Sequence, residues 1–284
     1  MRVFLSLTIA SLVIFALSCQ KKEEYGPLPD FPNTVAPYEF ASTPAWQDEF
    51  DIDGLPDAAK WDYDVGGNGW GNNELQYYTK ANPKNARVEN GKLIIEAIKE
   101  SFNSNNYTSA RLVIKKKGDW LYGKVVVRAK LPKGTGTWPA IWMLATEQTY
   151  GTAYWPDNGE IDIMEHVGFD PNVIHGTAHT KAYYFSIGTQ KTATTIVATA
   201  MSDFHDYILE WTPSEIKISV DDKNYFSFQK ESSEWQKWPF DKPFHLLLNI
   251  AVGGNWGGQK GVDNSIFPQR MEVDYVRVFP LKKN

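Results

Sequence analysis

Residues 155–166, WPDNGEIDIMEH, alternate carboxylates with large apolar side chains. Successive side chains of a β-strand point to opposite faces, so Glu160 and Asp162 share one face while Ile161 and Ile163 point into a core. Glu165 has the wrong parity to join the other two acids. One extra residue around 163–164, a β-bulge, returns it to their face. With such a bulge, three carboxylates would lie on one side of the strand.

Three aligned carboxylates repel one another, which is unfavourable unless the protein uses them. One interpretation is a solvent-facing acidic edge of a sheet with an ordinary strand end. The other is glycoside hydrolysis, in which one ionised carboxylate attacks the anomeric carbon and a second, protonated one donates to the leaving oxygen. Asp162 would then hydrogen-bond Glu160 and keep the proton on Glu165. These residues alone leave both interpretations open.

Short β-rich runs surround this strand, separated by clusters of Gly, Asn, Asp and Pro, and none has sustained helical periodicity. Strands are expected at residues 92–98, 110–115, 123–131, 140–144, 160–166, 174–180, 204–211, 215–220, 244–252 and 271–279. Residues 221–224, DDKN, are expected to form a hairpin turn. Many short strands in one domain of this size predict an all-β fold, a two-sheet β-sandwich of jelly-roll type.

The acidic stretch resembles the E-x-D-x-x-E signature of glycoside hydrolase family 16, in the bulged form of its laminarinase-like (endo-β-1,3-glucanase) branch. Further segments are similar to family motifs in the expected order, at residues 46–50, 69–78, 109–111, 136–144, 175–179, 253–258 and 271–278. The resemblance implies a curved jelly roll with a substrate cleft on its concave face. It also implies a retaining, endo-acting hydrolase that cleaves β-1,3 or mixed β-1,3/1,4 glucan such as laminarin by double displacement. No cofactor is expected for this chemistry.

The resemblance also implies roles for individual residues. The family's nucleophile, its helper aspartate and the acid/base correspond to Glu160, Asp162 and Glu165. His179 is expected near the acid/base or the leaving sugar. The full set of expected sugar-contacting residues is Trp138, Trp142, His179, Arg111, Asn72, Glu74, Asn255 and Trp256. Core filling by the tryptophans and loop bracing by the polar residues remain the alternatives.

A structural calcium on the convex face is implied by the same resemblance. Its expected ligands are Glu49, the Gly91 carbonyl and Asp274, because oxygen atoms suit this hard cation.

The N-terminal segment predicts export. Residues 1–18 have a basic start and an apolar run too short to span a bilayer comfortably, which is typical of a signal peptide. Small residues precede Cys19, the only cysteine in the sequence, and predict a lipobox with lipid attached there. An ordinary signal peptide with a chance cysteine is the alternative. Residues 20–24 resemble the charged export tags of surface lipoproteins of the Bacteroidota.

The expected organisation is a lipoprotein signal peptide at 1–18, a proline-rich tether at 19–44 and a catalytic jelly-roll domain at 45–282. Such a protein is a secreted lipoprotein of a Gram-negative bacterium, held at the outer membrane, including the cell surface, or in the periplasm. A monomer is expected.

The amino-acid composition indicates which classes of partner to expect. A formal net charge of −5 argues against nucleic acid, and 11 Trp and 14 Tyr suit stacking against sugar faces. The expected partners are a polysaccharide and, through the lipid, a membrane. Two rivals stay open: a galactan hydrolase of agarase, porphyranase or carrageenase type on the same fold, and a non-catalytic glycan-binding lipoprotein. The complete acid set favours an enzyme, because binding alone does not require it.

Overall fold

The computed structural model describes residues 38–282, so Cys19, the predicted signal peptide and most of the predicted tether lie outside the described residues. The chain from Tyr38 onward forms one compact unit. Phe40 forms a β-bridge with Leu281, and the Ala41 N–H donates to the Pro280 carbonyl at 2.9 Å. These contacts begin ahead of the predicted domain start at residue 45. Within residues 38–282, no helix has the length and apolar character needed to cross a membrane.

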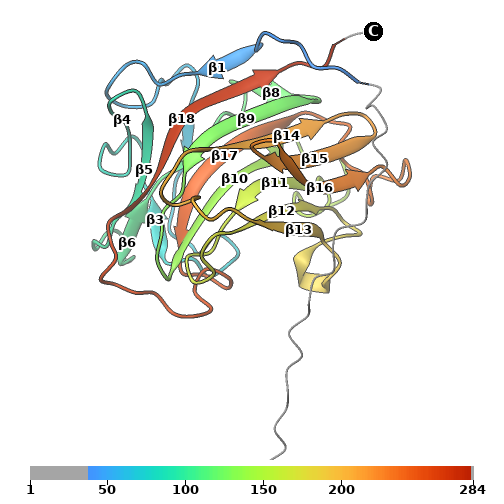
Figure 1. Ribbon diagram of the computed structural model, residues 1–284. Coiled ribbons are helices and arrows are strands. Elements are labelled where there is room, and N and C mark those ends of the chain that lie inside the picture. The colour runs from blue at the N-terminus through green and yellow to red at the C-terminus, as the bar shows by residue number, and fades with distance from the viewer. Residues whose placement is uncertain (1–37, 283–284) are drawn as a thin grey trace, which may run out of the picture. The chain divides into compact units, whose positions relative to one another are not determined.

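Two eight-stranded antiparallel sheets make up most of this unit (Figure 1). The first sheet contains, in order, β16 (Lys223–Gln229), β15 (Glu215–Val220), β14 (His205–Trp211), β9 (Gly123–Lys130), β18 (Gln269–Phe279), β5 (Leu93–Ala97) and β4 (Ala86–Val88), with β1 (Trp46–Asp48) paired to β18. The second contains β13 (Lys191–Ile196), β12 (Val173–His179), β11 (Glu160–Glu165), β10 (Thr137–Ala145), β17 (Phe244–Val252), β7 (Arg111–Val113) and β2 (Asp62–Asp64), with β8 (Asp119–Trp120) paired to β17.

The remaining elements are small. β3 (Gln76–Tyr78) and β6 (Tyr107–Ser109) form a parallel pair, and the 3-10 turn η1 (Phe185–Ile187) follows β12. The all-β sandwich predicted from the sequence is confirmed.

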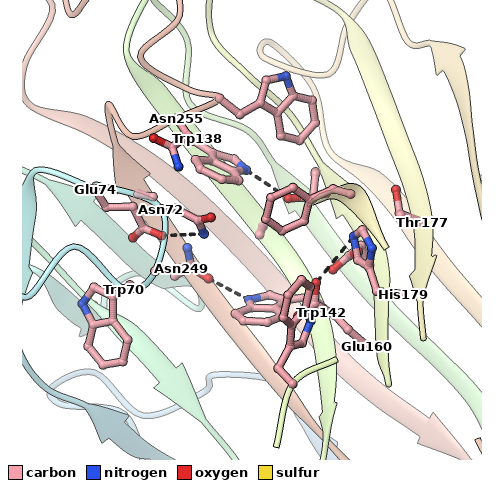
Figure 2. A pocket seen from close by; sticks show the side chains of 18 of the residues that line it. Trp70, Asn72, Glu74, Trp138, Trp142, Glu160, Thr177, His179, Asn249 and Asn255 are labelled. Carbon is pink, nitrogen blue, oxygen red and sulfur yellow. Dashed lines mark hydrogen bonds and ion pairs between the residues drawn. The ribbon is translucent and has the colours of Figure 1, made fainter. Parts of the chain in front are cut away.

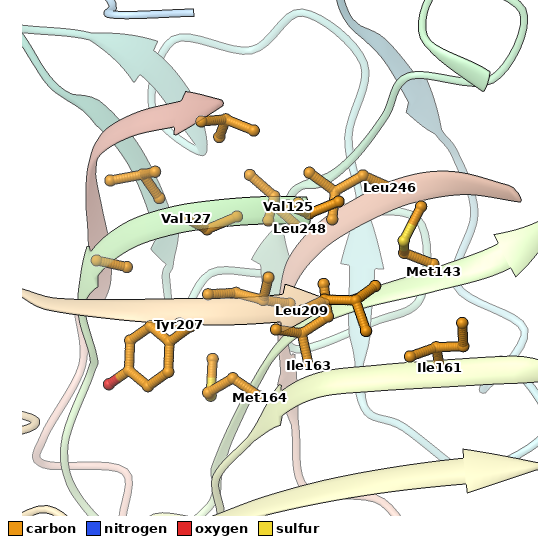
Figure 3. Packing of buried hydrophobic residues seen from close by; sticks show 14 of the residues in the cluster. Val125, Val127, Met143, Ile161, Ile163, Met164, Tyr207, Leu209, Leu246 and Leu248 are labelled. Carbon is orange, nitrogen blue, oxygen red and sulfur yellow. The ribbon is translucent and has the colours of Figure 1, made fainter. Parts of the chain in front are cut away.

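One apolar core joins the two large sheets (Figure 3). The first sheet contributes side chains such as Val127 and Leu209, and the second contributes Met143, Ile161 and Ile163. Burial of these side chains is the main term that holds the sheets face to face, at about 25 cal/mol per Å² of apolar surface. Because Ile161 and Ile163 take the core face of β11, the carboxylates of that strand are left for the opposite face.

The strand β17, with the sequence FHLLLNIAV, is buried along its whole length. A strand covered on only one face would alternate between buried and exposed residues. Leu246, Leu248 and Ile250 enter the core, whereas Asn249 and Ala251 line a cavity on the other face of the second sheet. The second sheet is therefore the layer between the core and this cavity.

Every strand expected from the sequence is present, with ends shifted by up to three residues. The hairpin turn is tighter than predicted, because only Asp221 and Asp222 separate Val220 from its partner Lys223. Asp221 has a φ of 52°, the left-handed conformation that such two-residue turns require.

Candidate active site

A bulge in β11 brings the three acids to one face. Opposite β12, Asp162 pairs with Thr177 and Glu165 pairs with His175, so three steps on β11 (162 to 165) match two steps on β12 (177 to 175). The pairing of β11 with β10 shifts at the same place. The extra residue predicted at 163–164 is confirmed.

The acids line a cavity of about 850 Å³ (Figure 2). All the residues expected to act on or contact the sugar line it as well: Asn72, Glu74, Arg111, Trp138, Trp142, Glu160, Asp162, Glu165, His179, Asn255 and Trp256. Their predicted convergence is confirmed, whereas their individual roles stay predictions.

Burial raises the pKa of all three acids. The pKa of Glu160 rises to about 8 through burial and then the negative charge of Glu165, with Arg111 opposing the rise. Burial raises the pKa of Glu165 to about 7, and the hydrogen bond from Trp138 opposes it. The pKa of Asp162 lies well above its usual range through burial and the charges of both glutamates. Such a cluster shares protons near neutral pH, as a site with one ionised and one protonated acid requires.

Glu165 is held by an aromatic group on the neighbouring strand. The Trp138 Nε1–H donates to Glu165 Oε1 at 3.0 Å (Figure 2). The Trp138 ring packs edge-on against Trp256, with centroids 5.5 Å apart, and Trp256 packs edge-on against His175 at 4.8 Å. Trp138 therefore fixes the direction of the Glu165 carboxyl.

Replacing Trp138 with phenylalanine is expected to lower kcat/KM on laminarin about tenfold, because a hydrogen bond to a charged group is lost. That hydrogen bond favours the ionised form of Glu165, so its loss raises the pKa of Glu165. If Glu165 must be protonated to act, activity falls as pH rises through this pKa, and the basic limb of the pH profile should move to higher pH. Trp142→Phe is the control. It alters a cavity tryptophan that donates to Asn249 instead, so a basic limb that moves equally in both variants would contradict the argument.

The two loops at the Glu165 end of the cavity are tied together. The Asn255 N–H donates to the Asn72 carbonyl at 2.7 Å, and the Asn73 side chain donates to Asn255 Oδ1 at 2.8 Å. The glycine-rich loop 253–258 is thus attached to the loop 69–74 and holds Trp256 over the cavity.

The position of His179 differs from the expectation. His179 pairs with Glu160 across the strands, and its Nε2 lies 3.7 Å from Glu160 Oε1 and 3.5 Å from Asp162 Oδ2. The histidine opposite Glu165 is His175. Burial lowers the pKa of His179 to about 4, so its imidazole is neutral at neutral pH.

The hydrogen bond expected from Asp162 to Glu160 is not formed either. Asp162 Oδ2 is buried without a hydrogen-bond partner among the described residues, and it faces His179. The charges of Glu160 and Glu165 raise the pKa of Asp162, whereas the charge that raises the pKa of Glu165 is that of Glu74, so the expected effect of Asp162 on Glu165 stays a prediction.

Arg111 carries a fixed positive charge into the cavity. Its guanidinium carbon lies 4.8 Å from the centroid of the Trp70 ring and 4.7 Å from that of Trp142. Its Nε lies 2.9 Å from Asp64 Oδ2. Held between two indoles and an aspartate, the guanidinium has little freedom to follow a ligand, and its charge favours the ionised form of Glu160.

Several cavity residues were not on the expected list, among them Trp70, Trp155, His175, Phe185 and Asn249. The first three lie inside or beside the motifs of the sequence, so the signal was present. Phe185 lies in η1, and Asn249 is a polar residue within an apolar run. Neither has a sequence signal that distinguishes it.

The two carboxylates among the predicted calcium ligands are engaged with arginines. Glu49 accepts hydrogen bonds from Arg277 with both oxygens, at 2.8 and 2.7 Å, and Asp274 Oδ2 lies 3.3 Å from Arg128 Nε. A calcium ion would have to displace these guanidinium groups, so the side chains as arranged do not fit it. Calcium at this position stays a prediction.

Comparison with known proteins agrees with this geometry. Residues 72–277 match the model of glycosyl hydrolases family 16. A beta-glucanase of Rhodothermus marinus is 62% identical over 239 residues, which cover 82% of this chain and 84% of the relative. The X-ray structure of the laminarinase from Rhodothermus marinus is similar with a TM-score of 0.85 at 59% identity, covering 87% of this chain and 99% of that one.

A second solved structure is that of a mutant of SCLam, a non-specific endo-β-1,3(4)-glucanase of the same family, which was co-crystallised with 1,3-β-D-cellotriosyl-glucose and presents 1,3-β-D-cellobiosyl-glucose at its active site. It has a TM-score of 0.80 at 48% identity and covers 87% of this chain and 96% of that one. The family match, the identity over most of the chain and the shared fold agree, and this chain belongs to glycosyl hydrolases family 16.

Proposed function

We propose that this protein is a retaining, endo-acting glycoside hydrolase that cleaves β-1,3 or mixed β-1,3/1,4 glucan such as laminarin. The observation that carries the proposal is the bulge in β11, which places Glu160, Asp162 and Glu165 along one cavity lined by tryptophans. The names of the relatives, β-glucanase, laminarinase and endo-β-1,3(4)-glucanase, support glucan as the substrate.

The proposed reaction has two displacements at the anomeric carbon. The ionised Glu160 attacks that carbon, and the bond to the leaving oxygen breaks as Glu165 donates its proton to it. The covalent glycosyl–enzyme is then hydrolysed by water, whose proton returns to Glu165 while the carbon–Glu160 bond breaks. Glu160 and Glu165, with pKa values raised to about 8 and about 7, share protons near neutral pH. The reaction uses the state in which Glu165 carries the proton and Glu160, whose ionised form is favoured by the charge of Arg111, does not.

Asp162 and His179 are proposed to support the nucleophile. Both face Glu160 from the nucleophile end of the cavity and are almost wholly buried, so they adjust its charge and position without contacting bulk water. Trp138, Trp142 and Trp256 are proposed to stack on the sugar rings, as flat apolar surfaces do in carbohydrate sites.

Release of reducing ends from laminarin, mixed-linkage glucan, agarose and carrageenan tests the proposal. Release is expected from the two glucans, with short oligosaccharides appearing early if the action is endo. Proton NMR of the first products should show the β-anomer, because two displacements retain configuration. Release from the galactans only would replace the proposal with the agarase-type alternative, and an α-anomer would exclude double displacement.

We also propose that the mature protein is a lipoprotein anchored through Cys19 to the outer membrane. The proposal rests on the sequence of residues 1–24, which lie outside the described part of the chain. In a Gram-negative host fed a labelled fatty acid, the wild type should carry the label and sediment with membranes. Cys19→Ser should lose both properties while its activity per folded molecule is unchanged, and a labelled Cys19→Ser protein would contradict the assignment.

The calcium site at Glu49, Gly91 and Asp274 is proposed only for a state in which Arg277 and Arg128 have released the two carboxylates. Added Ca²⁺ should then raise the unfolding temperature of the chelator-treated wild type and leave Asp274→Asn unaffected. An equal response of both proteins would place any calcium elsewhere.

A further inference from the structure

Glu160, Asp162 and His179 form a compact cluster at one end of the cavity. The ligand atoms of the three side chains all lie within 4.8 Å of one another, and His179 Nε2 is the atom that faces both carboxylates. Figure 2 shows His179 beside Glu160. Strand pairing fixes this arrangement, because Glu160 lies directly opposite His179 and Asp162 directly opposite Thr177. The cluster is thus built by the sheet and not by a loop.

The spacing of these atoms matches a tetrahedral metal site. Two ligand atoms that each lie about 2.1 Å from a tetrahedral Zn²⁺ are about 3.4 Å apart. The distances from His179 Nε2 to Asp162 Oδ2 and to Glu160 Oε1 are 3.5 and 3.7 Å. The ligand atoms of all three side chains lie within 4.8 Å of one another, so the two carboxyl groups would have to turn inward toward an ion that His179 also binds.

An unpaired buried atom points to the same place. Asp162 has 2% of its surface exposed, and its Oδ2 has no hydrogen-bond partner among the described residues although it faces the His179 ring. A buried carboxylate oxygen without a partner is unfavourable, and a bound cation would satisfy it.

We propose that Glu160, Asp162 and His179 bind a borderline transition-metal ion, Zn²⁺ or Cu²⁺, and that the bound ion excludes glucan from the catalytic centre. One imidazole nitrogen and two carboxylate oxygens are ligands that these ions accept, and a fourth position remains open toward the cavity. Calcium and magnesium require six or more oxygen ligands and avoid imidazole, so they are poor occupants. Metal binding does not depend on the proposed function, whereas the exclusion of glucan rests on it, because a metal-bound Glu160 cannot attack the sugar.

Titration calorimetry with ZnCl₂ tests the site on the full chain. All variants should carry Cys19→Ser, which removes the only thiol of the sequence. One zinc ion per chain is expected, and His179→Phe should weaken binding at least tenfold. Phenylalanine preserves the ring that packs near Trp155, and Glu160→Gln is a second variant should the first fail to fold. His205→Gln is the matched control, because His205 also pairs with an aspartate, at 2.8 Å from Asp221, but on the first sheet.

Each outcome decides part of the proposal. A saturating laminari-oligosaccharide should weaken zinc binding, and zinc should inhibit laminarin cleavage competitively. Zinc binding that folded His179→Phe and Glu160→Gln proteins retain in full would overturn the site. Binding that both variants lose but the oligosaccharide does not affect would overturn the exclusion of glucan. Zinc binding without any cleavage of laminarin would overturn the proposed function and leave the metal site in place.

Discussion

Replacing Glu160 with serine is expected to lower kcat on laminarin by about 10⁴-fold or more, because no covalent intermediate can form without the nucleophile. Binding of a laminari-oligosaccharide should survive, since the tryptophans that line the cavity are untouched. Product release and calorimetry on the same preparation measure the two quantities. The same two measurements also separate an enzyme from a glycan-binding protein, because a binding protein would show no turnover even before the substitution.

The matched control removes the same charge from the other sheet. Glu210 lies on β14, with its Oε1 4.0 Å from Lys124 Nζ, and Glu210→Gln should keep normal turnover. A Glu160→Ser protein that cleaves laminarin at the wild-type rate would reject Glu160 as the nucleophile.

Replacing Glu165 with alanine is expected to lower kcat/KM on laminarin by about 10²–10⁴-fold, the usual contribution of a general acid. The loss should be much smaller on an aryl laminari-oligosaccharide, because a good leaving group departs without a proton. Cleavage rates measured side by side on laminarin and on the aryl oligosaccharide give this difference. Glu165 is assigned the acid role because it takes the acid/base position of the family's E-x-D-x-x-E signature, and burial, which raises its pKa to about 7, lets it carry a proton near neutral pH.

Glu160→Ser provides the contrast for this experiment. Loss of the nucleophile should abolish cleavage of laminarin and of the aryl substrate equally, because attack on the anomeric carbon is needed whatever the leaving group. An equal loss on both substrates in Glu165→Ala would contradict the assignment of the two roles.

Parity reasoning predicted the most important element of the site. Glu160 and Asp162 share a face in any regular strand, and Glu165 can join them only through one extra residue. This count showed where a bulge would be needed, the resemblance to the bulged family signature favoured it, and the register shift between Asp162 and Glu165 confirms it. The long strands were predictable for a similar reason, because five or more residues suffice to show a β pattern.

The strands that were not predicted from the sequence lack such a β pattern. β2, β3, β4 and β6 have three residues each, too few to show alternation, and β13 is a polar edge strand with the sequence KTATTI. The position of His179 depends on the register between β11 and β12, which the connecting residues 166–172 set. Sequence motifs placed two histidines on one strand, but they could not say which acid each of them faces.

The burial of β17 on both faces has a consequence for how this protein should respond to heat. Regions that open locally have few apolar contacts and exposed backbone hydrogen bonds, and the floor of the cavity has neither feature. Its amide protons should exchange with solvent only when the whole domain unfolds. Inactivation and loss of structure should then follow one common curve, and the protein should retain its catalytic competence up to the temperature at which it melts.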